Sequence, residues 1–132
     1  VLHRSLPQAM AELDAVVPVF DLQRANAQRE RLGCSYAEVG AEFARHWRLP
    51  EPLALALERH ASPDTLSVDE PLAGYVHVAV WRARMELRSQ GIEALVAHFP
   101  EQVTRRLNID SRIVLDEQAI EWTSWEEAGA LL

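Results

Sequence analysis

Apolar residues recur at helical spacing along most of the chain, and no stretch alternates apolar and polar residues over the length of a strand. The clearest amphipathic segment follows Ser35 and Glu38, which form an S-x-x-E capping box, and it ends before Pro50. Its apolar side chains recur every three or four residues: Tyr36, Val39, Phe43 and Trp47. This pattern predicts a helix whose apolar face enters the core.

The same periodicity, bounded by prolines and glycines, predicts helices before and after this one. The expected ranges are 7–17, 19–32, 51–60, 71–89, 92–99 and 116–131, with Gly33 capping the second and a break at Pro100 before an apolar continuation. A second S-x-x-E box, Ser67 and Glu70, opens the 71–89 helix, and only 111–115 weakly favours a strand. The chain is therefore predicted to be all-α, a single compact bundle of about six or seven helices that forms one domain over residues 1–132.

The core is expected to centre on residues 72–81, which are apolar on nearly every side, whereas 82–88 should face water. The predicted core residues are Tyr36, Val39, Phe43, Trp47, Leu53, Leu57, Val76, Ala79 and Val80. Gly40 lies inside an otherwise strong helix, where glycine costs about 1 kcal/mol relative to alanine. We therefore expect a neighbouring element to approach the backbone closely at Gly40.

The sequence begins at Val1, inside an apolar-rich segment, which favours a piece of a longer polypeptide. A chain without the N-terminal half of its domain would leave an apolar face uncovered, and such faces are seldom left bare. We expect that face on the first two helices or on 72–81, covered by a second copy or another neighbour.

Charge and cysteine content narrow the classes of partner. Thirteen Lys and Arg against twenty Asp and Glu give a formal net charge of -7, which repels nucleic acid and anionic lipid. No 18-residue apolar run and no basic-then-apolar leader is present, so no membrane partner is expected.

The single cysteine, Cys34, cannot form an internal disulfide and is expected to be a small buried residue without a catalytic role. A reducing cytoplasm fits best.

The search for catalytic motifs leaves only dispersed histidines. No G-x-S-x-G, P-loop, G-x-G-x-x-G or H-E-x-x-H sequence occurs, and the five histidines lie in five different segments. His60 and His77 are the weak candidates for metal ligands, but the sequence around His77 offers no carboxylate. We therefore expect no metal and no cofactor, with both histidines bound to backbone carbonyls at a helix end and in the core.

Two tryptophans near the end of the chain are candidate interaction residues. Trp122 and Trp125 lie three residues apart on one face of the last predicted helix. Aromatic side chains in this arrangement pack on their own domain or anchor a partner.

A family resemblance is carried by residues that occur in a fixed order between Gly33 and Pro63. They are Ala37, Val39, Gly40, Ala41, Trp47, Leu49, Pro50, His60 and Pro63. This series resembles the second half of the HDOD domain, the HD-related output domain of bacterial signalling proteins. The similarity continues through 72–81, where the family's H-x-A-D segment stands here as His77, Val78, Ala79 and Val80.

Three departures from the family pattern each remove a potential metal ligand. Tyr36 and Arg59 stand where the family commonly has histidines, and Val80 takes the place of the aspartate. No adjacent His-Asp pair, which catalytic relatives carry in an earlier segment, occurs in the 132 residues. The resemblance thus implies a helical fold like that of the HD superfamily, whose enzymes are metal-dependent phosphohydrolases, but without catalysis.

Three functions remain under consideration. The first is a non-catalytic output or interaction module in bacterial signal transduction, contacting other signalling domains or proteins or forming a homodimer, as the resemblance implies. The second is an HD-type phosphohydrolase whose His-Asp pair lies upstream, with His60 and His77 as part of its metal site. The third is a helical dimerisation scaffold whose resemblance to the family is accidental.

Overall fold

The computed structural model describes residues 1–66, 70–87 and 92–116, and these residues form helices and connecting turns without a strand. The helices are α1 (Leu2–Ser5), α2 (Pro7–Val16), α3 (Arg24–Leu32), α4 (Tyr36–His46), α5 (Glu51–Arg59), α6 (Pro71–Leu87), α7 (Ile92–Ala97), α8 (Glu101–Arg106) and α9 (Ser111–Val114), with a 3₁₀ turn at Pro63–Thr65. The all-α prediction is confirmed.

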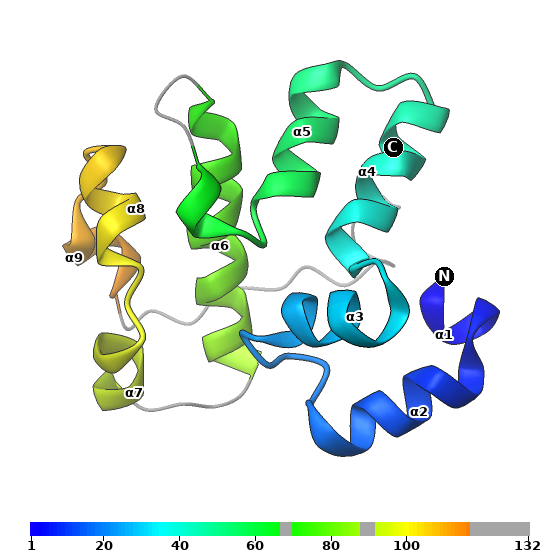
Figure 1. Ribbon diagram of the computed structural model, residues 1–132. Coiled ribbons are helices and arrows are strands. Elements are labelled where there is room, and N and C mark those ends of the chain that lie inside the picture. The colour runs from blue at the N-terminus through cyan, green and yellow to red at the C-terminus, as the bar shows by residue number, and fades with distance from the viewer. Residues whose placement is uncertain (67–69, 88–91, 117–132) are drawn as a thin grey trace, which may run out of the picture.

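Three helices form the middle of the molecule. In Figure 1, α4, α5 and α6 stand side by side, and α5 packs against both of its neighbours. The short helices α7, α8 and α9 lie beyond α6, while α1, α2 and α3 lie below α4 in that view. Segments from both ends of the sequence therefore flank a central layer of three helices.

Local sequence signals determine where most helices begin and end. Ser35 Oγ accepts a hydrogen bond from the Glu38 N–H, and the Glu38 carboxylate accepts one from the Ser35 N–H at 2.6 Å, so the predicted capping box is present. Gly33 ends α3 in the left-handed conformation, with φ 75°. The break at Pro100 is also confirmed, because Pro100 separates α7 from α8.

Other boundaries differ from prediction. The second helix begins at Arg24 rather than near residue 19, because residues 18–23 form a turn in which the Asp21 side chain accepts from the Gln23 N–H. Residues Ser111–Val114 form a helical turn rather than a strand, and Asp110 caps it by accepting from the Arg112 N–H. The proposed box at Ser67 and the helix predicted for 116–131 lie outside the described residues, except for position 116.

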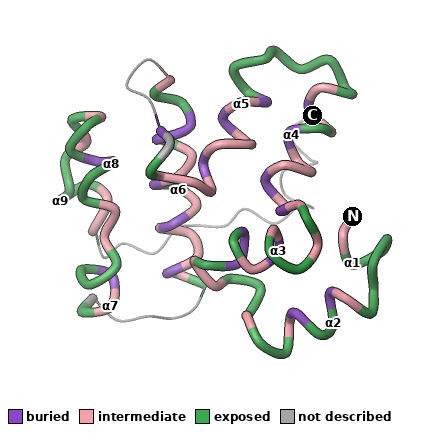
Figure 2. The backbone as a smooth tube through the Cα atoms, in the orientation of Figure 1, coloured by how far each residue is buried: buried purple, intermediate pink, exposed green. Residues whose placement is uncertain are grey.

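The seam between α4, α5 and α6 is built from small side chains. Its buried residues are Ala37, Ala41 and Ala44 on α4, Ala54 and Ala56 on α5, and Ala73 on α6. Figure 2 shows this buried strip running along the facing sides of the helices. Small residues allow helix axes to approach closely, so larger side chains on the same helices are directed toward the edges of the seam.

The predicted core list is therefore wrong in detail. Tyr36, Val39, Phe43, Leu57, Val76 and Val80 are only partly buried, and Trp47, Leu53 and Ala79 are exposed. The amphipathic pattern identified the helix correctly, but it assigned the inner face to the larger apolar residues. The alanines form the inner face, and their small side chains allow the helices to pack closely.

Helix α6 is buried along much of its length, including a part that was expected to face water. Met85, in the 82–88 segment, is 1% exposed, whereas Leu72 and Tyr75 in the expected core segment are exposed. Trp81 and Met85 pack with Leu95 of α7, and Val78 packs with Val103 of α8. The late helices cover one face of α6, and this cover could not be inferred from the α6 sequence alone.

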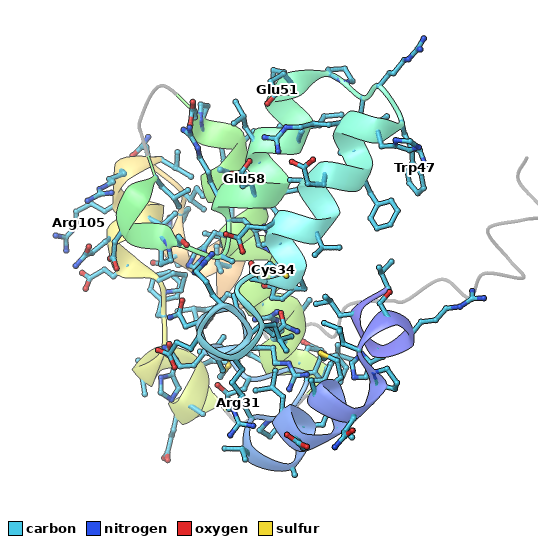
Figure 3. The ribbon with its side chains drawn as sticks, turned by 45° about the vertical axis from the view of Figure 1, so that its right-hand side comes forward. Arg31, Cys34, Trp47, Glu51, Glu58 and Arg105 are labelled. Atoms are coloured by element: carbon cyan, nitrogen blue, oxygen red, sulfur yellow. The ribbon has the colours of Figure 1, made fainter. Side chains whose placement is uncertain are left out.

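Exposed apolar side chains occur in several places. Val16, Val19 and Phe20 are exposed in the region of the first two predicted helices, as expected, and Trp47 on α4 is 69% exposed. Figure 3 shows Trp47 projecting from the outer side of α4. Among the described helices, none has the length and apolar character that a membrane span requires.

Gly40 does not meet a neighbour, contrary to expectation. A Cβ atom built at Gly40 has nothing within 4 Å, whereas one built at Gly74 would lie 2.6 Å from Leu107 Cδ1. The close approach predicted for α4 therefore occurs on α6, where α8 and the residue after it pack.

We predict that Gly40→Ala raises the free energy of unfolding by about 0.5–1 kcal/mol, because alanine favours the helix and its methyl group fits in open space. Gly33→Ala should lower it by about 1 kcal/mol, since L residues resist the left-handed conformation. Urea denaturation of both variants measures these opposite effects of one substitution. Destabilisation by Gly40→Ala would show that the backbone there is in close contact after all.

Candidate functional site

A cavity of about 280 Å³ lies where α3, the end of α5 and α6 meet the segment between α7 and α8. Its polar lining comprises Gln23, Asn26, Tyr36, His60, Asp64, His77, Arg84 and His98. Val80 and Trp81 belong to its apolar wall. The cavity gathers more polar side chains than the pocket beside Met10 and Phe20 or the pocket beside Cys34 and Phe43, so we take it as the candidate functional site.

Helical periodicity explains how α6 contributes to the cavity. His77, Val80, Trp81 and Arg84 follow one another at intervals of three, one and three residues, so they share one face of the helix. His60 caps the C-terminal end of α5, and Tyr36 is the first residue of α4. Four positions at which the family resemblance placed metal ligands therefore meet: Tyr36, His60, His77 and Val80.

Arg59, the fifth such position, lies elsewhere. Its guanidinium pairs with the Glu70 carboxylate, just before α6, and it does not line the cavity. The sequence pattern placed Arg59 and His60 together, but neighbouring residues at a helix end point in different directions. Only His60 of this pair enters the site.

Both histidines use Nδ1 to bind backbone. His60 Nδ1 lies 2.7 Å from the Leu57 carbonyl oxygen, and His77 Nδ1 lies 2.7 Å from the His60 carbonyl oxygen. A carbonyl can only accept, so each Nδ1 carries the proton, and in the neutral ring each Nε2 is left with a lone pair. The prediction that these histidines bind backbone carbonyls is confirmed, and His60 lies at a helix end as expected, but His77 is only partly buried.

The surroundings favour the neutral form of both rings. Burial lowers the pKa of His60 and of His77 below the ordinary value, and the Arg84 charge lowers both further. The hydrogen bonds to backbone carbonyls oppose this shift but do not cancel it. At neutral pH His60 and His77 are therefore uncharged beside the permanent cation Arg84, and the Asp64 carboxylate lies at the exposed edge of the same cavity.

Arg84 is the residue that the sequence analysis missed. Its guanidinium lies over the Tyr36 ring, 5.1 Å from the centroid, and Nη1 donates to the Asp21 carbonyl at 3.2 Å. Residues 82–88 were expected to face water, but Arg84 lies seven residues after His77 and thus on the same helical face. That spacing was the available signal.

Tyr36 joins the arginine to the first histidine. Its hydroxyl lies 3.4 Å from His60 Nε2, at the outer limit of hydrogen bonding, and the two rings pack edge to face with centroids 5.8 Å apart. Because His60 Nε2 is unprotonated, the tyrosine hydroxyl is the donor in this pair. Tyr36 thus occupies its family position as a hydrogen-bond donor rather than as a metal ligand.

Trp81 contributes a buried donor without a partner. The residue is 3% exposed and packs edge to face on Phe99, while its indole Nε1 makes no hydrogen bond within the described structure. A buried N–H without an acceptor costs about 1–3 kcal/mol.

The residues of this cavity do not fit the divalent metal that relatives of the HD type use. Hydrolytic metal centres combine imidazole with oxygen ligands, and no group of three or more metal-binding side chains occurs among the residues that the structure places. Val80 provides a hydrocarbon wall, and Arg84 repels a cation.

The remaining candidate residues lie apart from this cavity. Cys34 is partly exposed rather than buried as expected, and it lines a shallow pocket on the outer side of α4 with Val39 and Phe43. Trp122 and Trp125 lie outside the described residues. The exposed family positions Trp47, Leu49 and Pro50 form the outer end of the α4–α5 connection.

Comparison with known proteins gives one match. The family model of the HDOD domain matches residues 1–63, a segment that runs from α1 to the start of the 3₁₀ turn and contains all of the motif between Gly33 and Pro63. No curated protein and no solved structure gives a significant match. The cavity thus combines residues of the matched segment with α6, which lies outside the match.

We predict that acid lowers stability because of the two cavity histidines. Below the unfolded histidine pKa of about 6.5, the unfolded chain binds protons that the folded chain resists. The free energy of unfolding should therefore fall from pH 7 to 5, by up to about 1.4 kcal/mol per pH unit for each histidine, until the lowered folded pKa is passed. Denaturant melts across this range measure the slope.

His77→Asn provides the test of this origin, because asparagine keeps an N–H donor for the His60 carbonyl but does not titrate. The slope should be shallower in this variant than in the parent, while His46→Asn, at the exposed end of α4, should retain the parent's slope. Equal slopes in the parent and in His77→Asn would contradict the assignment.

Proposed function

We propose that this chain, whose residues 1–63 belong to an HDOD domain, is a non-catalytic output or interaction module of bacterial signal transduction. The observation that carries the proposal is the composition of the cavity. Two imidazoles with protonated Nδ1 atoms, a valine and a permanent guanidinium line it, and the family resemblance suggests metal ligands of HD-type hydrolases at the positions of the two histidines and the valine.

The surface of α4 supports a role in protein contacts. The rings of Phe43 and Trp47 pack at a tilt of 49° with centroids 5.7 Å apart, and Trp47, Leu49 and Leu53 are exposed around the α4–α5 connection. Exposed aromatic residues commonly anchor protein interfaces, and Arg48 beside them supplies a charge at the rim. This surface, rather than the cavity, is where we place contact with another signalling domain or with a second copy.

The alternative functions have less support. A phosphohydrolase would require oxygen ligands that the cavity lining near His60 and His77 lacks, apart from the exposed Asp64. An accidental resemblance does not agree with a family match that includes the whole quoted motif. We assign the chain to the cytoplasm as part of the proposal, with no nucleic-acid or membrane partner.

We predict that the purified chain does not hydrolyse model phosphodiesters or phosphomonoesters in the presence of Mn²⁺, Fe²⁺ or Zn²⁺. The reason is that no ligand set holds an ion that could activate water. Bis-(p-nitrophenyl) phosphate and p-nitrophenyl phosphate serve as substrates, and a His60→Gln/His77→Gln variant provides the background rate. Metal-dependent turnover that disappears in the variant would overturn the non-catalytic assignment.

We further predict that a photo-crosslinking amino acid at position 47, tested in the native cells, captures a signalling protein or a second copy of the chain. The same amino acid at position 113 is the matched control, because Ile113 is equally exposed but lies on α9. Mass spectrometry identifies the product, and Phe43→Ser should reduce its yield at position 47. Equal labelling from both positions, or none from position 47, would contradict a specific surface on α4.

A further inference from the structure

We propose that the cavity between α3, the end of α5 and α6 binds a small carboxylate-bearing anion through Arg84. This inference goes beyond the signalling role and does not depend on it. The cavity does not suit a metal cation, and the permanent charge of Arg84 that disfavours a cation favours an anion.

The first feature is a fixed positive charge. Arg84 is held by the Tyr36 ring and by the Asp21 carbonyl, and its guanidinium lines the cavity. The planar fork of a guanidinium matches the two oxygens of a carboxylate. An arginine that is already positioned by its neighbours loses little side-chain entropy when it binds.

The second feature is an aromatic wall beside the arginine. Trp81 lies one turn before Arg84 on the same face of α6 and lines the cavity. Its indole Nε1 is buried beyond the reach of a water-sized molecule, so a ligand in the cavity contacts the ring and not this N–H. Trp81 thus gives the cavity an apolar side for the hydrocarbon part of a ligand, and its indole resonance reports on that contact.

The third feature is a pair of acceptors that become donors when protonated. His60 and His77 each retain an Nε2 lone pair, and both feel the Arg84 charge. Arg84, Tyr36, Asp64 and His98 are the other titratable or charged side chains that line the cavity. A bound anion would offset the Arg84 charge and favour protonation, so binding should take up a proton and strengthen as pH falls.

The size of the cavity limits the ligand. A volume of about 280 Å³ lies at the lower end of small-molecule sites. Leu22, Val80, Pro63 and Pro100 form apolar walls that suit a short hydrocarbon part attached to the charged group. A small organic acid fits this combination better than a nucleotide, which is larger and carries more charge.

The experiment is a titration of the full chain with sodium propionate, followed by the ¹H–¹⁵N resonance of the Trp81 indole. A Trp81→Phe variant identifies that resonance among those of the four tryptophans. Sodium chloride at equal ionic strength controls for general anion effects, and inorganic phosphate tests whether charge without a hydrocarbon part suffices. Each titration is repeated at pH 8 and pH 6.

Arg84→Gln removes the proposed charge, and Arg82→Gln is the matched control. Arg82 lies two residues earlier on α6 and pairs with Glu86 and the Asp116 carbonyl, outside the cavity. Arg84→Lys keeps the charge but loses the fork, so it tests the same contact if Arg84→Gln does not fold.

The proposal predicts a saturable shift with propionate, with a dissociation constant of roughly 1 mM or below. Affinity should rise at pH 6, fall at least tenfold in Arg84→Gln and by a smaller factor in Arg84→Lys, and stay unchanged in Arg82→Gln. Equal shifts with chloride, or propionate binding that survives both Arg84 variants, would overturn it. Tighter binding of phosphate than of propionate would refute the organic acid.

Discussion

The hydrogen bond from His77 Nδ1 to the His60 carbonyl joins the end of α5 to the middle of α6. The last carbonyls of a helix have no hydrogen-bond partner within that helix, and this bond supplies one for the His60 carbonyl at the end of α5. It also determines the His77 tautomer, because the ring must donate to a carbonyl. The lone pair of Nε2 follows from this contact, whereas burial and the Arg84 charge, which lower the His77 pKa, keep the ring neutral against it.

A second constraint is how closely α4, α5 and α6 pack against one another. Alanines line the facing sides of α4 and α5, and Arg45 on α4 pairs with Glu51 and Glu58 of α5 at 3.2 and 2.5 Å. Figure 3 labels the two glutamates on α5. These pairs are partly exposed, so they contribute little stability and mainly orient the two helices. Close packing of small residues leaves the aromatic stripe of α4 at the surface. The exposure of Trp47 is therefore a direct result of how the core is packed.

The candidate site shows that a fold can bring the same positions together while the chemistry of their side chains differs. The four positions at which the family resemblance suggested metal ligands lie around one cavity, although their side chains are not a metal-ligand set among the described residues. The helices can keep these four positions around one cavity while substitutions change whether the cavity favours a cation or an anion. Val80 and Arg84, one turn apart on α6, account for that change: one lacks a ligand atom and the other repels a cation.

The sequence by itself determined the all-α class, the Ser35 capping box, the Gly33 cap, the break at Pro100 and the relation of residues 33–63 to the HDOD domain. These features depend on residues close in the chain, where turn chemistry and periodicity act directly. It also identified His60 and His77 as backbone-bound. Only the tertiary structure showed that alanines rather than Phe43 and Trp47 form the seam, and that Arg84 faces the histidines. The reason is physical: periodicity identifies a helix's faces, but the distance and identity of its neighbours decide which face is buried.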